Sequence, residues 1–151
     1  MTVFKYIKRN QIFFLKNTNK HDSINELVSY FSKIDDSLNV DDIRQKIFHR
    51  ETLMSTGIGL GIGIPHLRYK GILDPLVFLG IQKDGIPDYE SIDKDPVKLM
   101  VIILVGENEH KEYLKILSSI VGFFKKDDNI AKLLSFSTVD DIYNFVTGEL
   151  K

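Results

Sequence analysis

Two apolar runs that lack polar alternation restrict what this chain can fold into. Residues 75–81 read PLVFLGI and residues 97–105 read VKLMVIILV. A strand that faces water on one side alternates apolar and polar residues, whereas a continuous apolar strand is buried on both faces. We therefore expect a sheet with helices packed on both sides.

Helical patterns stand before and after these runs. A short apolar segment, residues 11–15, is expected as a first strand. Apolar residues at i, i+3, i+4 and i+7 spacing follow a capping asparagine, and similar patterns recur later. The expected helices run from Asn19 through Ile34, from Asn39 toward Glu51, from His110, around residues 130–134, and after a cap formed by Ser137 with Asp140. The order predicts an α/β fold, a three-layer α/β/α sandwich with a mixed central sheet, built as a single domain over residues 1–151.

Three details of this prediction can be tested directly. The helix from His110 is expected to bury one face made by Leu114, Leu117, Ile120, Val121 and Phe124. Residues 83–88 are expected to form a turn between the two long strands. Finally, Ile58, Leu60, Ile62 and Ile64 alternate and are expected to point into one side of the core.

The composition excludes several classes of protein. The chain has 20 Lys and Arg against 21 Asp and Glu, which argues against general attraction to nucleic acid or to a membrane surface. It has no cysteine, so disulfides, thiolate catalysis and cysteine-bound metals are excluded. Without a secretion signal or a window of about 18 apolar residues, no membrane insertion is expected and the cytoplasm is the expected compartment.

A run of alternating glycines, Gly57-x-Gly59-x-Gly61-x-Gly63, leads to Pro65 and His66. Dinucleotide-binding motifs need glycines at offsets 0, 2 and 5, and phosphate-binding loops need Gly-Lys-Ser/Thr, so neither motif is present. The spacing instead predicts a glycine-rich hairpin or bulge. One face without side chains lets another backbone or a ligand approach closely.

His66 is a candidate to carry a phosphoryl group. A neutral imidazole is nucleophilic near pH 7, and it needs one free ring nitrogen and an acceptor that orients the other. Donors must also meet the oxygens of the moving group. The candidate donors are Arg50, Ser55, Thr56 and the glycine N–H groups.

The string RExxxSTGIGxGIxIPH over residues 50–66 resembles the signature of EIIA domains of the fructose/mannitol class of the bacterial phosphoenolpyruvate-dependent phosphotransferase system. That class includes the nitrogen-regulatory EIIA proteins, and the resemblance extends over nearly the whole chain. Lys20 matches a recurrent family lysine, and His110 matches the family's second histidine. The resemblance again implies an α/β/α sandwich.

The resemblance also implies roles for particular residues. His66 would accept the phosphoryl group from phospho-HPr, with Arg50 near the phosphoryl site and His110 close to His66, which it assists or orients. No metal, nucleotide or organic cofactor is implied. Two departures stand out: Gly63 replaces a usual alanine, which we expect to be tolerated and more flexible, and Leu67 replaces a small residue after His66.

Several interpretations remain open from the sequence. His110 could simply cap a helix, and Arg50 could be a solvated cation at a helix end. The function we favour is a stand-alone nitrogen-regulatory EIIA with a signalling role through target proteins. The alternatives are a transport EIIA that passes phosphate to the EIIB of a sugar permease, and a binding module of the same fold without phosphotransfer.

Overall fold

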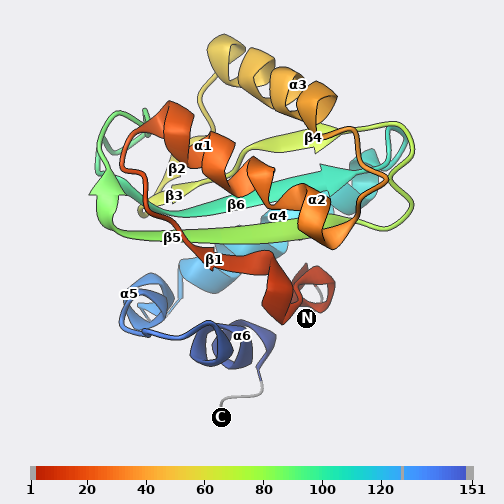
Figure 1. The fold of residues 1–151 in the computed structure, drawn as a ribbon. Coiled ribbons are helices and arrows are strands. Elements are labelled where there is room, and N and C mark those ends of the chain that lie inside the picture. The colour runs from red at the N-terminus through yellow and green to blue at the C-terminus, as the bar shows by residue number, and fades with distance from the viewer. Residues whose placement is uncertain (1–2, 127, 149–151) are drawn as a thin grey trace.

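A mixed sheet lies between two layers of helices in the computed structural model, which describes residues 3–126 and 128–148 (Figure 1). The helices α1, α2 and α3 cover one face of the sheet, and α4, α5 and α6 cover the other. The predicted three-layer α/β/α sandwich is therefore confirmed. The helices are α1 (Lys20–Ser29), α2 (Phe31–Ile34), α3 (Val40–Leu53), α4 (His110–Phe124), α5 (Asn129–Leu134) and α6 (Val139–Thr147), preceded by 3-10 turns at Val3–Tyr6 and Arg9–Gln11.

The sheet has six strands among the described residues, in the order β1-β5-β6-β3-β2, and β4 also pairs with β6. The β1–β5, β3–β6 and β4–β6 pairs are parallel, whereas β5–β6 and β2–β3 are antiparallel. The sheet is mixed, as predicted. The strands are β1 (Ile12–Phe14), β2 (Gly57–Gly59), β3 (Ile62–Gly63), β4 (His66–Arg68), β5 (Leu76–Ile86) and β6 (Val97–Val105).

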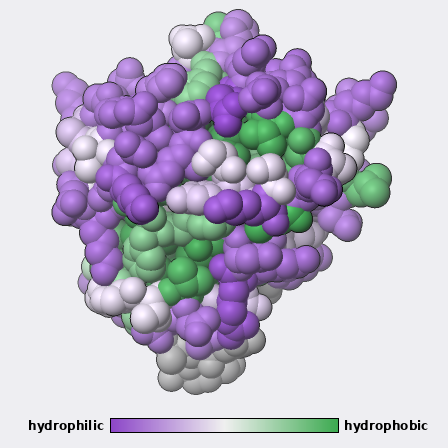
Figure 2. All heavy atoms as spheres, in the orientation of Figure 1, coloured by the Kyte–Doolittle hydropathy of each residue, from purple (hydrophilic) through white to green (hydrophobic). Residues whose placement is uncertain are grey.

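The central strand β6 supplies both hydrophobic cores. Leu99, Val101 and Ile103 point into the core beneath α4, α5 and α6. Met100 and Ile102 point into the opposite core, which α1, α2 and α3 close. This two-sided burial is the physical reason that the sequence of β6 shows no polar alternation. On the face seen in Figure 2, hydrophilic residues cover most of the surface, and a hydrophobic area is visible beneath α3.

The helix starts follow ordinary capping chemistry. The side chain of Asn19 accepts a hydrogen bond from the Asp22 N–H, and that of Asn39 accepts one from the Asp42 N–H. Both caps lie where the sequence predicts them. The last cap is displaced by one residue from the prediction, because Thr138 rather than Ser137 accepts from the backbone.

Three other expectations about local structure are wrong in part. The first helix ends at Ser29 and a separate turn of helix follows at Phe31–Ile34. The strand β5 continues to Ile86, through a register irregularity, into the segment expected to be a turn. On α4 the fully buried positions include Ile116, and Leu114 is 47% exposed, so the buried face is rotated from the predicted one.

The glycine run forms a tight hairpin, as expected, between β2 and β3. Leu60 is the exception to the predicted alternation, because it lies in the turn at φ +61° and is 40% exposed. The bare face of β2 is met by another backbone. A Cβ on Gly57 would lie 2.2 Å from the carbonyl oxygen of Glu90, so only glycine fits there.

No helix in the described ranges is long and apolar enough to cross a membrane.

The cap of α3 gives a first prediction. Asn39→Ala removes the side-chain acceptor for the Asp42 N–H and should lower the free energy of unfolding by about 1 kcal/mol in urea denaturation. Asn39→Asp keeps an acceptor and should stay near the native value. An equal loss in both variants would show that the cap hydrogen bond is not what stabilises this end of α3.

Candidate functional site

His66 is the first residue of β4, which pairs with the central strand β6. It is opposite Ile103 of β6 in a parallel register. Just before it, the Pro65 carbonyl accepts a hydrogen bond from the Ile103 N–H at 3.0 Å. Proline fixes φ at this point, so the backbone that carries the imidazole is held on both sides.

The two ring nitrogens of His66 have different partners. Nδ1 lies 3.0 Å from the carbonyl oxygen of Ile64, and Nε2 lies 3.1 Å from Nη2 of Arg50. A carbonyl oxygen can only accept and a guanidinium can only donate. The proton therefore sits on Nδ1, and Nε2 carries the lone pair.

The surroundings of His66 favour its neutral form. Burial lowers the pKa of the imidazole most strongly, and the nearby positive charge of Arg50 lowers it further. The hydrogen bond to Ile64 and the negative charge of Glu51 act in the opposite direction but do not outweigh these effects. A half-buried, neutral imidazole whose Nε2 keeps its lone pair can act as a nucleophile once Arg50 turns away from that nitrogen.

Arg50 reaches His66 from the last turn of α3. The helix ends three residues later, and the two side chains at its end, Leu53 and Met54, are 71% and 77% exposed. These residues line a cavity of about 460 Å³ together with His66. The remaining lining residues are Ser55, Thr56, Ile58, Ile64, Tyr113 and Leu117.

His110 reaches the site through an intermediary. It is the first residue of α4, and its ring is 6.2 Å, between centroids, from that of Tyr113. Tyr113 in turn stacks on His66, with centroids 4.6 Å apart and planes inclined by 23°. Within the described residues no hydrogen bond joins the two histidines, so Tyr113 is the side chain that contacts both rings.

The two hydroxyl residues predicted to be near the phosphate line the cavity, but both are already hydrogen-bonded. Ser55 donates to the Glu90 carbonyl oxygen at 2.6 Å. Thr56 donates to the carboxylate of Glu51, also at 2.6 Å. Their hydroxyl groups thus connect neighbouring segments of the chain in this structure.

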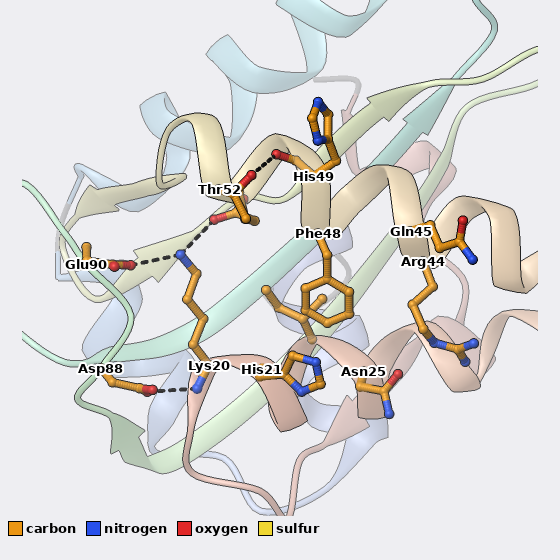
Figure 3. Close-up of a pocket in the computed structure, with 12 residues that line it drawn as sticks. Lys20, His21, Asn25, Arg44, Gln45, Phe48, His49, Thr52, Asp88 and Glu90 are labelled. Atoms are coloured by element: carbon orange, nitrogen blue, oxygen red, sulfur yellow. Dashed lines mark hydrogen bonds and ion pairs between the residues drawn. The ribbon is translucent and has the colours of Figure 1, made fainter.

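Glu51 lines a second cavity and is hydrogen-bonded to Thr56, which lines the first. Its side chain is only 5% exposed and pairs with Lys20, Nζ to Oε1, at 3.0 Å. Lys20 also reaches Glu90 at 2.8 Å and donates its backbone N–H to Asp88, and Figure 3 shows both contacts. The second cavity, of about 810 Å³, lies between α1 and α3.

Gly63, expected from the sequence to add flexibility, has a spatial role. A Cβ at this position would lie 2.5 Å from Cζ of Tyr89, whose side chain is buried. Its φ is not in the left-handed region, unlike that of Gly59 or Gly61. The glycine makes room for Tyr89, which is a different reason from the flexibility expected from the sequence.

Three side chains of this region were not identified by sequence reasoning as parts of the site. Tyr113 could have been found, because it follows His110 by three residues and so lies on the same helix face. Glu51 belongs to the string over residues 50–66, but nothing in its spacing shows that the Glu51 carboxylate is buried. Tyr89 comes from a distant loop and has no local signal.

No group of three or more His, Cys, Asp or Glu side chains in the described part of the chain is arranged to hold a metal ion.

The crowding at Gly63 gives a second prediction. Gly63→Ala places a methyl group against the Tyr89 ring and should destabilise the protein by about 1–3 kcal/mol in thermal or urea unfolding. Gly122→Ala is the matched control, since a Cβ there meets nothing within 4 Å and α4 should tolerate it. A Gly63→Ala variant as stable as the native protein would contradict the steric role.

The electrostatics of His66 give a third prediction. Because its pKa is lowered, the imidazole should protonate at a lower pH than an ordinary histidine does. Arg50→Gln removes a positive charge beside Nε2, which should raise this pKa. Titration of the His66 ring resonances by NMR measures both midpoints, and a lower midpoint in Arg50→Gln would refute the assignment.

Known proteins share both the sequence and the fold of this chain. It is 30% identical over 132 residues to a fructose-specific EIIABC component of Bacillus subtilis, matching 87% of this chain and 21% of that protein. It is 34% identical over 104 residues to a nitrogen regulatory protein of Pseudomonas aeruginosa, matching 69% and 67% of the two chains. The crystal structure of nitrogen regulatory protein IIA-Ntr from Neisseria meningitidis superposes with a TM-score of 0.86 at 25% identity, covering 97% of this chain and 99% of that one.

The chain thus spans about a fifth of the Bacillus protein and most of the nitrogen regulatory protein of Neisseria. Residues 5–148 match the family model described as phosphoenolpyruvate-dependent sugar phosphotransferase system, EIIA 2. That match covers almost the whole chain. This protein belongs to the EIIA type-2 family of the phosphotransferase system.

Proposed function

We propose that this protein is a phosphocarrier of the cytoplasm that accepts a phosphoryl group from phospho-HPr on Nε2 of His66 and passes it on. We further propose that it is an EIIA of the nitrogen-regulatory type, whose phosphorylation state signals to target proteins. Within this proposal Arg50 is the cationic partner of the phosphoryl group, and His110 assists from the start of α4.

One observation carries the proposal. The Ile64 carbonyl holds the proton on Nδ1, so the lone pair of Nε2 is available in the cavity beside Arg50. A nucleophilic histidine needs this arrangement, in which one nitrogen donates its proton to an orienting acceptor and the other keeps its lone pair. The lowered pKa keeps the ring neutral and therefore reactive near pH 7.

The transfer balances without a cofactor. A bond forms between Nε2 and phosphorus while the bond from phosphorus to the donor breaks, and the proton on Nδ1 stays on the ring. The product ring carries positive charge, which the Ile64 carbonyl stabilises through the same hydrogen bond. Arg50 would then turn its donors from Nε2 to the phosphoryl oxygens, where a guanidinium binds two oxygens at once.

The rim of the cavity suits a protein as the phosphoryl donor better than a small molecule. Leu53 and Met54 are large apolar side chains that line the cavity and lie largely exposed. Exposed apolar side chains grouped around a reactive group are typical of surfaces that dock other proteins. HPr on the donor side, and a target protein or an EIIB domain on the acceptor side, fit this surface.

The likeness in fold favours the regulatory form over the transport form. The Neisseria nitrogen regulatory protein superposes with a TM-score of 0.86, whereas mannitol IIA of Escherichia coli superposes with 0.75. The transport alternative remains as a relay to the EIIB of a sugar permease. A binding module without phosphotransfer has less support, because such a module would not need Nε2 paired with Arg50.

The fourth prediction is that this protein accepts a phosphoryl group from phosphoenolpyruvate through enzyme I and HPr. With radiolabelled phosphoenolpyruvate, the native protein should acquire acid-labile label and His66→Ala should acquire none. Arg50→Ala should be labelled at least about tenfold more slowly, because the charge beside the transferred group is lost. His49→Ala serves as the control, since His49 is exposed and lies outside the cavity.

Label retained by His66→Ala would refute His66 as the acceptor, and an unlabelled native protein would favour the binding module. Adding an EIIB domain to the labelled protein separates the remaining two alternatives. Rapid loss of label to EIIB supports transport, whereas retained label supports the regulatory form.

A further inference from the structure

Thr56 makes four hydrogen bonds that connect the helix carrying Arg50 to the strand leading to His66. Its Oγ1 lies 2.6 Å from Oε2 of Glu51 and 2.5 Å from the hydroxyl of Tyr89. Its N–H donates to the other carboxylate oxygen of Glu51 at 3.3 Å. Its carbonyl oxygen accepts from the N–H of Ile64 at 3.0 Å.

On the helix side these bonds hold the last turn of α3. Glu51 follows Arg50 directly, and its buried carboxylate is bound by Thr56 on one side and by Lys20 on the other. Figure 3 shows that Lys20 comes from the start of α1. The backbone that carries Arg50 is thus tied both to α1 and to the loop before β2.

On the strand side the same residue holds the backbone that orients the imidazole. Ile64 donates its N–H to Thr56 and accepts the Nδ1 proton of His66 with its carbonyl. Tyr89, the other partner of the Thr56 hydroxyl, packs against Gly63 one residue earlier. Thr56 therefore lies within two hydrogen bonds of the ring of His66.

A count of donors shows that the Thr56 hydroxyl is fully used. A hydroxyl has one proton to donate, and an ionised carboxylate can only accept. Thr56 therefore donates to Glu51 and accepts from Tyr89, which leaves no proton for a phosphoryl oxygen. Ser55 is in the same position, since it donates to the carbonyl of Glu90.

We infer that Thr56 is a positioning residue for phosphoryl transfer, which sets the placement of Arg50 against His66 through Glu51 and Tyr89, and that it does not bind the phosphoryl group. The inference rests on the proposed function for its kinetic consequence. Its structural consequence, a change in His66 itself, can be measured without any transfer.

Three variants and two controls test this inference. Thr56→Val removes the hydroxyl and keeps the shape, Thr56→Ser keeps the hydroxyl, and Tyr89→Phe removes only its partner. Thr52→Val is the matched control, because the Thr52 hydroxyl donates only to the His49 carbonyl on the exposed side of α3. Tyr30→Phe is the second control, since the Tyr30 hydroxyl binds Glu26 far from the site.

Two measurements are made on each folded variant. The first is the set of ring nitrogen resonances of His66 in the unphosphorylated protein, by NMR. The second is the rate of labelling from phospho-HPr, together with the rate at which the phosphorylated protein loses its label in buffer.

Thr56→Val and Tyr89→Phe should both shift the His66 resonances and slow labelling, Thr56→Val by about tenfold, as expected for residues coupled in one hydrogen-bond network. The double variant Thr56→Val/Tyr89→Phe removes the same network only once. Its fold-decrease in labelling rate should therefore be clearly smaller than the two single fold-decreases multiplied together. Thr56→Ser and both controls should behave as the native protein does. If Thr56→Val fails to fold, Tyr89→Phe tests the same link.

Two results would overturn the inference, and a third would overturn only the proposed function. Native His66 resonances in Thr56→Val with faster loss of label would indicate direct contact with the phosphoryl group. A Thr56→Ser variant as slow as Thr56→Val would show that the hydroxyl is not the cause. If the native protein takes up no label, the proposed function fails, and the NMR shift in Thr56→Val against Thr52→Val alone decides whether Thr56 positions His66.

Discussion

The burial of β6 on both faces is the constraint on which the rest of this structure depends. This strand pairs with β5 on one side and with β3 and β4 on the other. Its side chains alternate between two cores, so a shift of one residue would exchange them and disrupt both. Because β4 pairs with β6 in register, with His66 opposite Ile103, the same constraint fixes where the candidate site lies.

The fold was predictable where burial or capping leaves a local pattern. The bounds of β6 and the caps at Asn19 and Asn39 follow from the sequence for that reason. Leu60 was misplaced because a hairpin turn requires a left-handed residue there, and its tight geometry overrides the alternation. The rotated face of α4 shows a similar limit, since an apolar helix with several adjacent apolar residues fits more than one orientation.

Only those residues of the candidate site that lie in the segment 50–66 could be predicted from the sequence. Arg50 and His66 belong to the same string, and the structure brings their side chains into contact. Tyr89 enters from a loop whose backbone passes the bare face of Gly57, and no spacing rule predicts that approach. Gly63 is understandable only together with Tyr89, so its meaning depends on a contact between segments far apart in the sequence.

The choice of partner for Nδ1 has an electrostatic reason. A carboxylate in place of the Ile64 carbonyl would orient the ring equally well, but its negative charge would raise the pKa of the imidazole and repel an incoming phosphoryl group. Glu51, the carboxylate whose negative charge acts on His66, is instead paired with Lys20 and hydrogen-bonded to Thr56. A neutral carbonyl on one nitrogen and a cation beside the other leave His66 uncharged, oriented and open to an anion.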